Sequence, residues 1–322
     1  MIRVSGLTKD YGARRAIDNI SFNIEKGQIV GFLGPNGAGK TTTMRILTGY
    51  IPPTFGKVEI NGLDVLEKSL EVRKIVGYLP ETVPLYNDMT VFEYLMFMAK
   101  LRNLKKPEDR VDEVLEVVHM EDRADGYISN LSKGMRQRIG LSQALLHQPE
   151  VLILDEPTIG LDPAQIIEVR NLIREIGKER TILLSTHILT EAQQICNQVI
   201  IINKGHIVAE DTTEKLQARL TGAQRVKVKI RGEADDIIKI VSSTQGVLNT
   251  ILKSDDTLEF ESSPGTDARP LVARAIINSG YDLLELQPAS ISLEDIFLQL
   301  TREEPNVPSI EELSDIEKSE ER

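Results

Sequence analysis

Several features are scarce in this sequence of 322 residues, and each absence argues against a class of protein. Cys196 is the one cysteine, so an intramolecular disulfide is excluded and a reducing compartment is expected. No apolar stretch reaches the roughly 18 to 20 residues needed to span a bilayer, and the start at Ile2 lacks the pattern of a secretory signal. The net charge is −11 and no stripe is rich in lysine or arginine, which argues against nucleic acid as a partner. A role at a membrane therefore requires a separate anchoring partner.

A glycine-rich stretch carries the strongest chemical signal in the chain. The apolar run at residues 29–33 predicts a buried strand, and residues 42–47 follow a helical pattern. The turn between them reads Gly34-Pro35-Asn36-Gly37-Ala38-Gly39-Lys40-Thr41-Thr42. Its glycines let the backbone aim N–H groups at phosphate oxygens, while the lysine adds positive charge and the Thr41 hydroxyl can ligate a bridging Mg²⁺. The pattern predicts a nucleoside triphosphate site; the alternative is a glycine-rich turn without a ligand.

Two acidic residues follow a second apolar run. Residues 151–154 are four aliphatic side chains in succession, which predicts a parallel strand buried on both faces, and Asp155 and Glu156 end it. Because two carboxylates at a buried strand end need a compensating charge, we expect Asp155 to hold Mg²⁺ and Glu156 to deprotonate an attacking water. The alternative is that these acids only cap a helix.

Three further residues are singled out by their positions in the chain. Tyr11 precedes the glycine-rich turn, where its ring can stack on an adenine base, although a packed tyrosine is the plainer interpretation. Ser132 is an expected helix N-cap. Residues 181–184 predict another buried strand, which brings His187 to the edge of the sheet where ligands of α/β proteins gather. We therefore expect His187 to reach the terminal phosphate.

Together these motifs resemble the nucleotide-binding subunit of ATP-binding-cassette (ABC) transporters over roughly residues 1–220. The motifs that match are the Walker A loop at Gly34 to Thr41, the Walker B strand at Val151 to Glu156, the signature motif at Leu131 to Met135, the D-loop at Ile159 to Asp162, and the switch histidine at His187. The sequence Leu-Ser-Lys-Gly-Met-Arg-Gln-Arg is most similar to the corresponding stretch of ATPase subunits of type-2 exporters, including the gliding-motility and multidrug-resistance branches.

The chain departs from the family pattern in two places. The signature loop carries Lys133 and Met135 at two positions where the family has other residues, but it keeps Ser132 and Gly134, which face the γ-phosphate of the partner subunit in the family. Glu81 stands where the family has the glutamine of the Q-loop. Since a carboxylate near a phosphate is repelled by it, Glu81 must contact Mg²⁺, stay distant from the phosphate or bind a proton, and we hypothesise that it helps to bind the metal ion.

The resemblance implies a fold class and a function. The implied fold is α/β: a P-loop NTPase cassette over residues 1–221, with a mixed sheet and an inserted helical subdomain at about 84–148. The implied protein hydrolyses ATP with Mg²⁺, forms a head-to-tail dimer of identical subunits, and drives a separate membrane-spanning permease as an exporter from the cytoplasmic face of the membrane. The alternatives are an ABC-type ATPase that acts on a non-membrane partner and a degenerate cassette that serves only as a scaffold.

The strand and helix pattern restarts after residue 221. Residues 222–301 predict the order β-α-β-β-α-β, which suggests a small ferredoxin-like α+β domain. We expect this domain to stabilise the dimer or to regulate it. Residues 302–322 form an acidic tail for which the composition predicts disorder.

Overall fold

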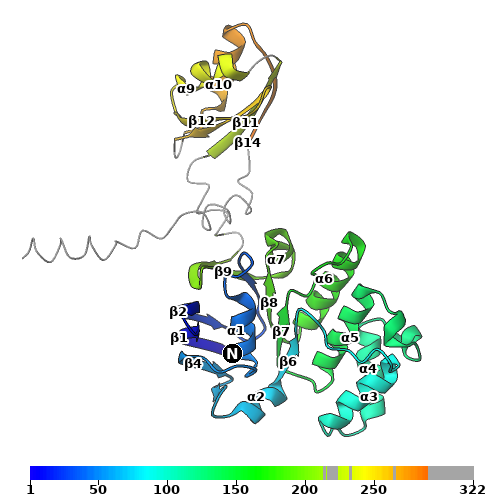
Figure 1. Ribbon diagram of the computed structural model, residues 1–322. Coiled ribbons are helices and arrows are strands. Elements are labelled where there is room, and N and C mark those ends of the chain that lie inside the picture. Colours follow the sequence, from blue (N-terminus) through cyan, green and yellow to red (C-terminus); the bar gives the residue numbers. More distant parts are fainter. Residues whose placement is uncertain (213–214, 216–223, 232–233, 264–265, 289–322) are drawn as a thin grey trace, which may run out of the picture.

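The computed structural model describes residues 1–212, 215, 224–231, 234–263 and 266–288. We refer to residues 1–212 as the N-terminal part and to residues 224–288 as the C-terminal unit, and we describe each by itself (Figure 1). The sequence pattern also predicts helices at about residues 213–220 and 293–300. Apart from residue 215, these helices, the boundary near residue 221 and the acidic tail lie outside the described residues. In the part of the chain that is described, no helix has the length and apolar character needed to cross a bilayer.

The N-terminal part contains two β-sheets. The smaller sheet is antiparallel, with the order β2-β1-β4-β5. Its strands are β1 (Ile2–Tyr11), β2 (Arg14–Ile24), β4 (Phe55–Ile60) and β5 (Leu63–Asp64). The larger sheet has the order β10-β9-β3-β8-β7-β6 and is parallel except for the antiparallel edge pair β10 and β9. Its strands are β3 (Ile29–Leu33), β6 (Val76–Leu79), β7 (Val151–Asp155), β8 (Thr181–Thr186), β9 (Gln198–Asn203) and β10 (His206–Asp211).

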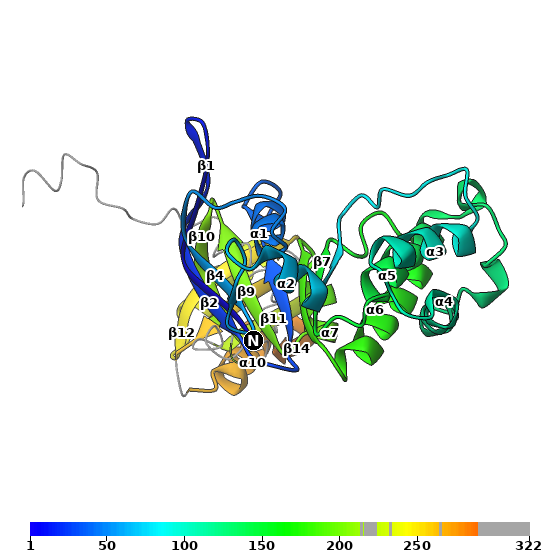
Figure 2. The ribbon, with the colours of Figure 1, turned by 90° about the horizontal axis from the view of Figure 1, so that it is seen from below.

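The larger sheet is covered on both faces, which explains why its central strands β3, β7 and β8 are buried along their whole length and rich in aliphatic residues. On one face, α1 (Lys40–Leu47) lies between the two sheets, and Met44 and Leu47 pack in a core with Phe22, Phe32 and Ile153 (Figure 2). The helix α2 (Ser69–Ile75) packs against the same core through Val72. The other face carries the helices α5 (Lys133–Leu145), α6 (Pro163–Gly177) and α7 (Leu189–Ile195).

The section between β6 and β7 is helical, as the sequence predicts. It contains α3 (Val91–Leu101), α4 (Pro107–Val117), the short 3-10 turns at Glu121–Arg123 and Ile128–Asn130, and then α5. The predicted capping box at the start of α3 is confirmed: Glu93 N–H donates to Thr90 Oγ1 at 3.2 Å, and Thr90 N–H donates to Glu93 Oε2 at 2.9 Å. Figure 2 shows α3, α4 and α5 grouped together, away from the hairpin of β1 and β2.

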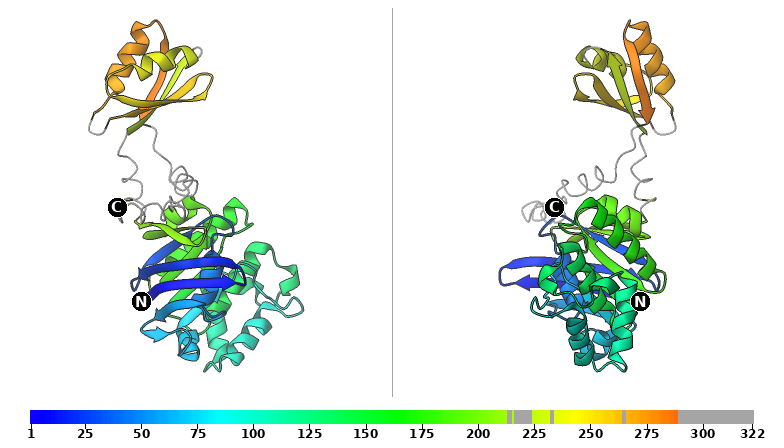
Figure 3. Two further views of the ribbon diagram at one scale, coloured as in Figure 1. Left: turned by 60° about the vertical axis from the view of Figure 1, so that its left-hand side comes forward. Right: turned by 90° about the vertical axis from the view of Figure 1, so that its right-hand side faces the viewer.

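The C-terminal unit is an antiparallel sheet with helices on one face (Figure 3). Its elements, in chain order, are β11 (Gln224–Arg231), α9 (Ala234–Ser242), β12 (Val247–Ser254), β13 (Thr257–Ser262), α10 (Arg269–Asn278) and β14 (Asp282–Pro288). The strand order is β12-β13-β11-β14, and alternate residues such as Val228 and Phe260 pack with Ile237 and Val272 in one small core. The element order agrees with the sequence pattern, and the ferredoxin-like assignment stays a prediction.

Candidate active site

The glycine-rich turn joins β3 to α1 and lies in close contact with two other strands. A Cβ added to Gly34 would come within 2.4 Å of the Ile202 carbonyl oxygen of β9. A Cβ added to Gly39, whose φ is 113°, would come within 2.8 Å of the Ala16 carbonyl oxygen of β2. Only glycine fits at these two positions, because backbone occupies the space that a side chain would need. The backbones of β9 and β2 therefore restrict the conformation of the loop.

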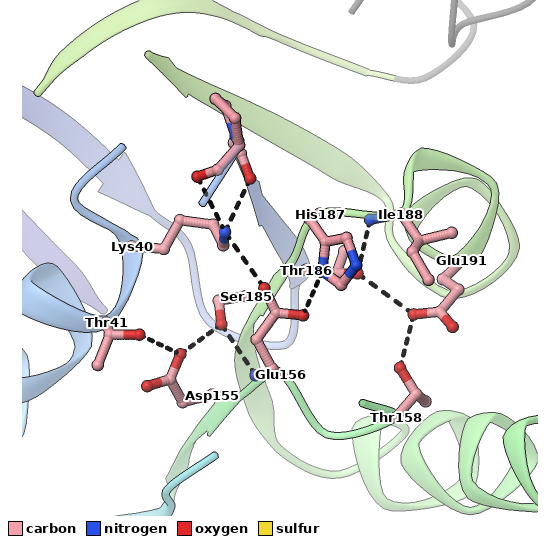
Figure 4. A network of polar contacts seen from close by, with 12 residues as sticks. Lys40, Thr41, Asp155, Glu156, Thr158, Ser185, Thr186, His187, Ile188 and Glu191 are labelled. Carbon is pink, nitrogen blue, oxygen red and sulfur yellow. Dashed lines mark hydrogen bonds and ion pairs between the residues drawn. The ribbon is translucent and has the colours of Figure 1, made fainter. Parts of the chain in front are cut away.

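A buried lysine, a buried glutamate and a histidine form a chain of contacts beside this loop (Figure 4). Lys40 Nζ donates to the Gly34 carbonyl oxygen at 2.7 Å and lies 3.2 Å from Glu156 Oε1. The other carboxylate oxygen, Glu156 Oε2, lies 2.9 Å from His187 Nδ1. Because Lys40 and Glu156 are both nearly inaccessible to solvent, each compensates the charge of the other in an environment that would penalise either alone.

Glu156 also adopts an unusual backbone conformation. Its φ is 48°, in the left-handed region that a glutamate rarely occupies. Its N–H donates to Ser185 Oγ at 2.9 Å, so the neighbouring strand β8 fixes the turn that follows β7. Strain of this kind persists where the surrounding structure holds a side chain in a required direction. Here it directs the carboxylate toward Lys40 and His187.

Asp155 lies at the carboxyl end of β7 and is buried. Its Oδ1 accepts hydrogen bonds from Ser185 Oγ at 2.6 Å and from Thr41 Oγ1 at 3.3 Å. Its Oδ2 is buried and has no hydrogen-bond partner among the residues that the structure describes. Burial raises the pKa of Asp155 above its usual range, and the negative charges of Glu81 and Glu156 add to that increase.

A cavity of about 590 Å³ lies over the glycine-rich turn and brings together residues from several elements. The predicted site residues that line it are Tyr11, Asn36, Gly37, Gly39, Lys40, Thr41, Thr42, Glu81 and Glu156. Ile159 of the expected D-loop lines it as well, and so do Arg14, Ala16 and Arg45, which were not predicted from the sequence. Arg45 could have been found, because it lies one helical turn after Thr41 on α1.

Other predicted residues lie outside the lining of this cavity. The carbonyl oxygens of Gly34 and Pro35 accept hydrogen bonds from Lys40, and Ala38 is buried, so these three residues shape the loop. His187 contacts the site through Glu156. Ser132 caps α5 as predicted, since its Oγ accepts a hydrogen bond from the Met135 N–H at 3.3 Å.

The signature loop at the start of α5 contacts the D-loop and α6 of the same chain. A Cβ on Gly134 would come within 2.7 Å of the Gln165 side chain, and a Cβ on Gly160 would come within 2.1 Å of Lys133 Nζ. Ser132 and Gly134 are absent from the lining of the 590 Å³ cavity. A slightly larger groove of about 620 Å³, which includes Arg138 and Glu168, contains none of the predicted site residues.

These features define a class of protein. A glycine-rich loop between a buried parallel strand and a helix, with a lysine, a threonine and strand-end acids around one cavity, is the site of a P-loop nucleoside triphosphatase.

Comparisons with known proteins identify the family within this class. Residues 17–159 match the family model described as ABC transporter. The bacitracin transport ATP-binding protein BcrA of Bacillus licheniformis is 35% identical over 302 residues, which cover 93% of this chain and 97% of that protein. The Nod factor export ATP-binding protein I of Paraburkholderia xenovorans is 35% identical over 317 residues, which cover 94% of this chain and 97% of that protein.

A solved structure of an ATP-binding subunit of an ABC transporter is 32% identical, with a TM-score of 0.62 over 69% of this chain and 93% of that one. The chain therefore belongs to the ATP-binding subunits of ABC transporters, and it has the P-loop ATPase fold of that family. The sequence-based predictions of the cassette fold and of the family are confirmed.

Proposed function

We propose that two copies of this chain close around ATP in a head-to-tail dimer and drive a separate membrane-spanning permease that exports its substrate. The direction of transport is supported by the relatives, one of which is described as a Nod factor export protein and another as a bacitracin transport protein. The chain would act at the cytoplasmic face of the membrane, bound to that permease.

The position of Glu156 carries this proposal. One of its carboxylate oxygens contacts Lys40 and the other contacts His187, next to the loop that would hold the phosphates. When Lys40 turns to the negative charge of the β- and γ-phosphates, Glu156 Oε1 becomes available to accept a proton from an attacking water. His187, which remains at Oε2, positions the carboxylate and can contact the γ-phosphate.

The residues around Asp155 fit a magnesium ion. Oxygen ligands are the preferred ligands of Mg²⁺, and the site offers the Thr41 hydroxyl together with a buried Asp155 oxygen that has no protein partner. The ion, when bound, would supply positive charge that polarises the phosphate groups. Glu81 is exposed at the rim of the same cavity, and we propose that it assists in holding the metal.

The signature loop supports the dimer. Ser132 and Gly134 lie at the N-terminus of α5, where helix N–H groups can bind an anion, yet neither lines the cavity of its own chain. A γ-phosphate in one subunit can bridge the two anion sites if the signature loop comes from a second copy. Each copy then completes the site of the other.

Exposed aromatic side chains beside the Q-loop support a permease partner. Tyr86 is 51% exposed and Phe97 is 36% exposed, and their rings contact each other with centroids 5.9 Å apart. Leu101, which is 62% exposed, extends this apolar surface along α3. A surface of this kind suits contact with another protein, and its place next to Glu81 links it to the nucleotide site.

Replacement of the proposed base tests the function. We expect Glu156→Gln to slow ATP hydrolysis by about 10² to 10⁴ while a closed, ATP-bound dimer accumulates. The rate is measured by phosphate release with Mg²⁺ present, and the dimer by size-exclusion chromatography with and without ATP. Glu175→Gln serves as the control, because Glu175 is an exposed residue of α6 that pairs with Lys178. Normal turnover in Glu156→Gln would rule out the proposed base.

A further inference from the structure

The hairpin formed by β1 and β2 brings an arginine to the phosphate loop. Tyr11 and Arg14 are paired across the end of this hairpin, and both line the nucleotide cavity. The strand β2 then passes directly over the loop, where the Ala16 carbonyl oxygen occupies the space beside Gly39. A Cβ placed on Gly37 would lie 3.8 Å from Arg14 Nη2. The Arg14 guanidinium therefore lies beside the middle of the phosphate loop.

The alternation of side chains along β2 explains why Arg14, and not the arginine after it, faces the cavity. Arg14 and Ala16 are two residues apart and both line the cavity, as residues on one face of a strand do. Arg15 points the other way, where its guanidinium pairs with Asp10 at 2.9 Å and with Asp18 at 3.0 Å. Two adjacent arginines thus have opposite surroundings.

The charge of Arg14 has no carboxylate partner among the residues that the structure describes. Lys40, the cation within the loop itself, is already compensated by Glu156. A guanidinium that lines a polyphosphate cavity with its donors available can form charge-assisted hydrogen bonds to phosphate oxygens.

We propose that Arg14 is a nucleotide-binding residue that contacts the polyphosphate chain beside Gly37. This inference rests on the assignment of the cavity to ATP, and it adds a contact that the family motifs of this chain do not include. Because Arg14 lies by Gly37 of the phosphate loop, it favours nucleotides that carry a di- or triphosphate over the unphosphorylated nucleoside. It does not act on the base, which the adjacent Tyr11 is expected to hold.

Binding measurements on the full chain test this inference. We expect Arg14→Ala to weaken binding of ATP without Mg²⁺ and of ADP about five- to tenfold, the range of an exposed charge-assisted hydrogen bond. The loss should be smaller at high salt, because exposed charges are screened. Binding of adenosine should not change. Arg14→Lys should retain most of the affinity, since it keeps the positive charge.

Arg15→Ala is the matched control, because it removes an adjacent arginine that faces away from the cavity. It should leave every nucleotide affinity unchanged. Equal losses in Arg14→Ala and Arg15→Ala, an equal loss for adenosine, or unchanged ADP affinity in Arg14→Ala would each overturn the assignment. Wild-type chain that binds neither ATP nor ADP would instead contradict the proposed function, so the two failures are distinguishable. Circular dichroism confirms that each variant is folded.

Discussion

The pKa values of Asp155 in the N-terminal part and Asp256 in the C-terminal unit are shifted in opposite directions. In the N-terminal part, Asp155 is buried, and burial raises its pKa even though Ser185 and Thr41 donate hydrogen bonds to it. In the C-terminal unit, Asp256 lies at the surface with its side chain 44% exposed, and hydrogen bonds from Thr257 and Ser254 lower its pKa. One environment works against the ionised form and the other favours it.

The same contrast extends to the backbone and to the ion pairs. Glu156 holds a positive φ at a buried position, whereas the positive φ values described in the C-terminal unit belong to Gly246 and Gly280. Ion pairs in that unit, such as Lys227 with Glu285, lie on the exposed sheet surface, where each contributes little. The N-terminal part therefore contains a buried carboxylate and a strained backbone that lower its stability, and a bound phosphate and a metal can offset these effects. The C-terminal unit has no such features among its described residues.

Two glycine substitutions test this contrast most strongly. Gly34→Ala places a methyl group 2.4 Å from the Ile202 carbonyl oxygen, so the phosphate loop must shift. We expect ATP affinity to fall by about 100-fold or more, because small displacements of positioned groups have effects of that size. Isothermal titration calorimetry with ATP measures the loss.

The matched substitution in the C-terminal unit is Gly280→Ala. Its φ of 84° strains an alanine, but in the described part of the chain no heavy atom apart from those of its two chain neighbours lies within 4 Å of the new methyl group. The expected cost is about 1 to 2 kcal/mol of stability, with ATP affinity unchanged. Equal ATP affinities in the two variants would contradict the view that the loop is held in shape by backbone contacts.

Much of the nucleotide site could be predicted because its signals are local. The phosphate loop, the apolar run that ends in Asp155 and the capping box of Thr90 with Glu93 each depend on neighbouring residues, and the structure has them as expected. The strand β9 was missed, although its buried residues Val199 to Ile202 repeat the aliphatic pattern of β7. The helices α6 and α7 were missed as well, and α6 carries a signal in Asp162, its N-cap, followed by Pro163.

Other features of the site depend on the folded chain and have no local signal. The contact of Lys40 with Glu156 joins residues far apart in sequence, and it forms only because β3 and β7 lie in one sheet. The positive φ of Glu156 contradicts the preference of its residue type. The orientation of Arg14 depends on the pairing of β2 with β1 and on the close approach of β2 to the loop.

The Q-loop carboxylate gives the next prediction in order of effect. Glu81 adds negative charge near Asp155, so its removal should reduce the attraction for a cation and the repulsion of phosphate. We expect Glu81→Gln to raise the Mg²⁺ concentration for half-maximal ATPase activity about three- to tenfold, and to tighten binding of ATP without Mg²⁺. Glu285→Gln, which removes a paired glutamate of the C-terminal unit, is the control. An unchanged Mg²⁺ dependence would exclude a role of Glu81 at the metal.

The buried aspartate should destabilise the nucleotide-free chain at neutral pH. A carboxyl whose pKa is raised in the folded state adds stability below its unfolded pKa, and that contribution is lost as the pH rises through the folded pKa. Asp155→Asn removes the charge, so we expect the Tm at pH 7 to rise by about 2 °C, and the difference to shrink toward acid pH. Thermal unfolding without nucleotide measures it. A lower Tm in Asp155→Asn would show that the hydrogen bonds of the carboxylate outweigh its burial.

Asp256→Asn should show the opposite sign and the smallest effect. A carboxyl whose pKa is lowered in the folded state adds stability above its unfolded pKa, which is lost as the pH falls through the folded pKa. Hydrogen bonds from Thr257 at 2.8 Å and Ser254 at 2.9 Å provide that stability, and Lys229 Nζ lies 3.3 Å from the carboxylate. Because the carboxylate lies at the surface, we expect Asp256→Asn to lower the Tm by at most about 1 °C at pH 7. Thermal unfolding and hydrogen exchange of the β13 amides measure this effect. The two aspartates have the same charge and residue type and differ in burial. A decrease in Tm as large as the increase for Asp155→Asn would therefore mean that exposed turns of the C-terminal unit contribute as much to stability as the buried site.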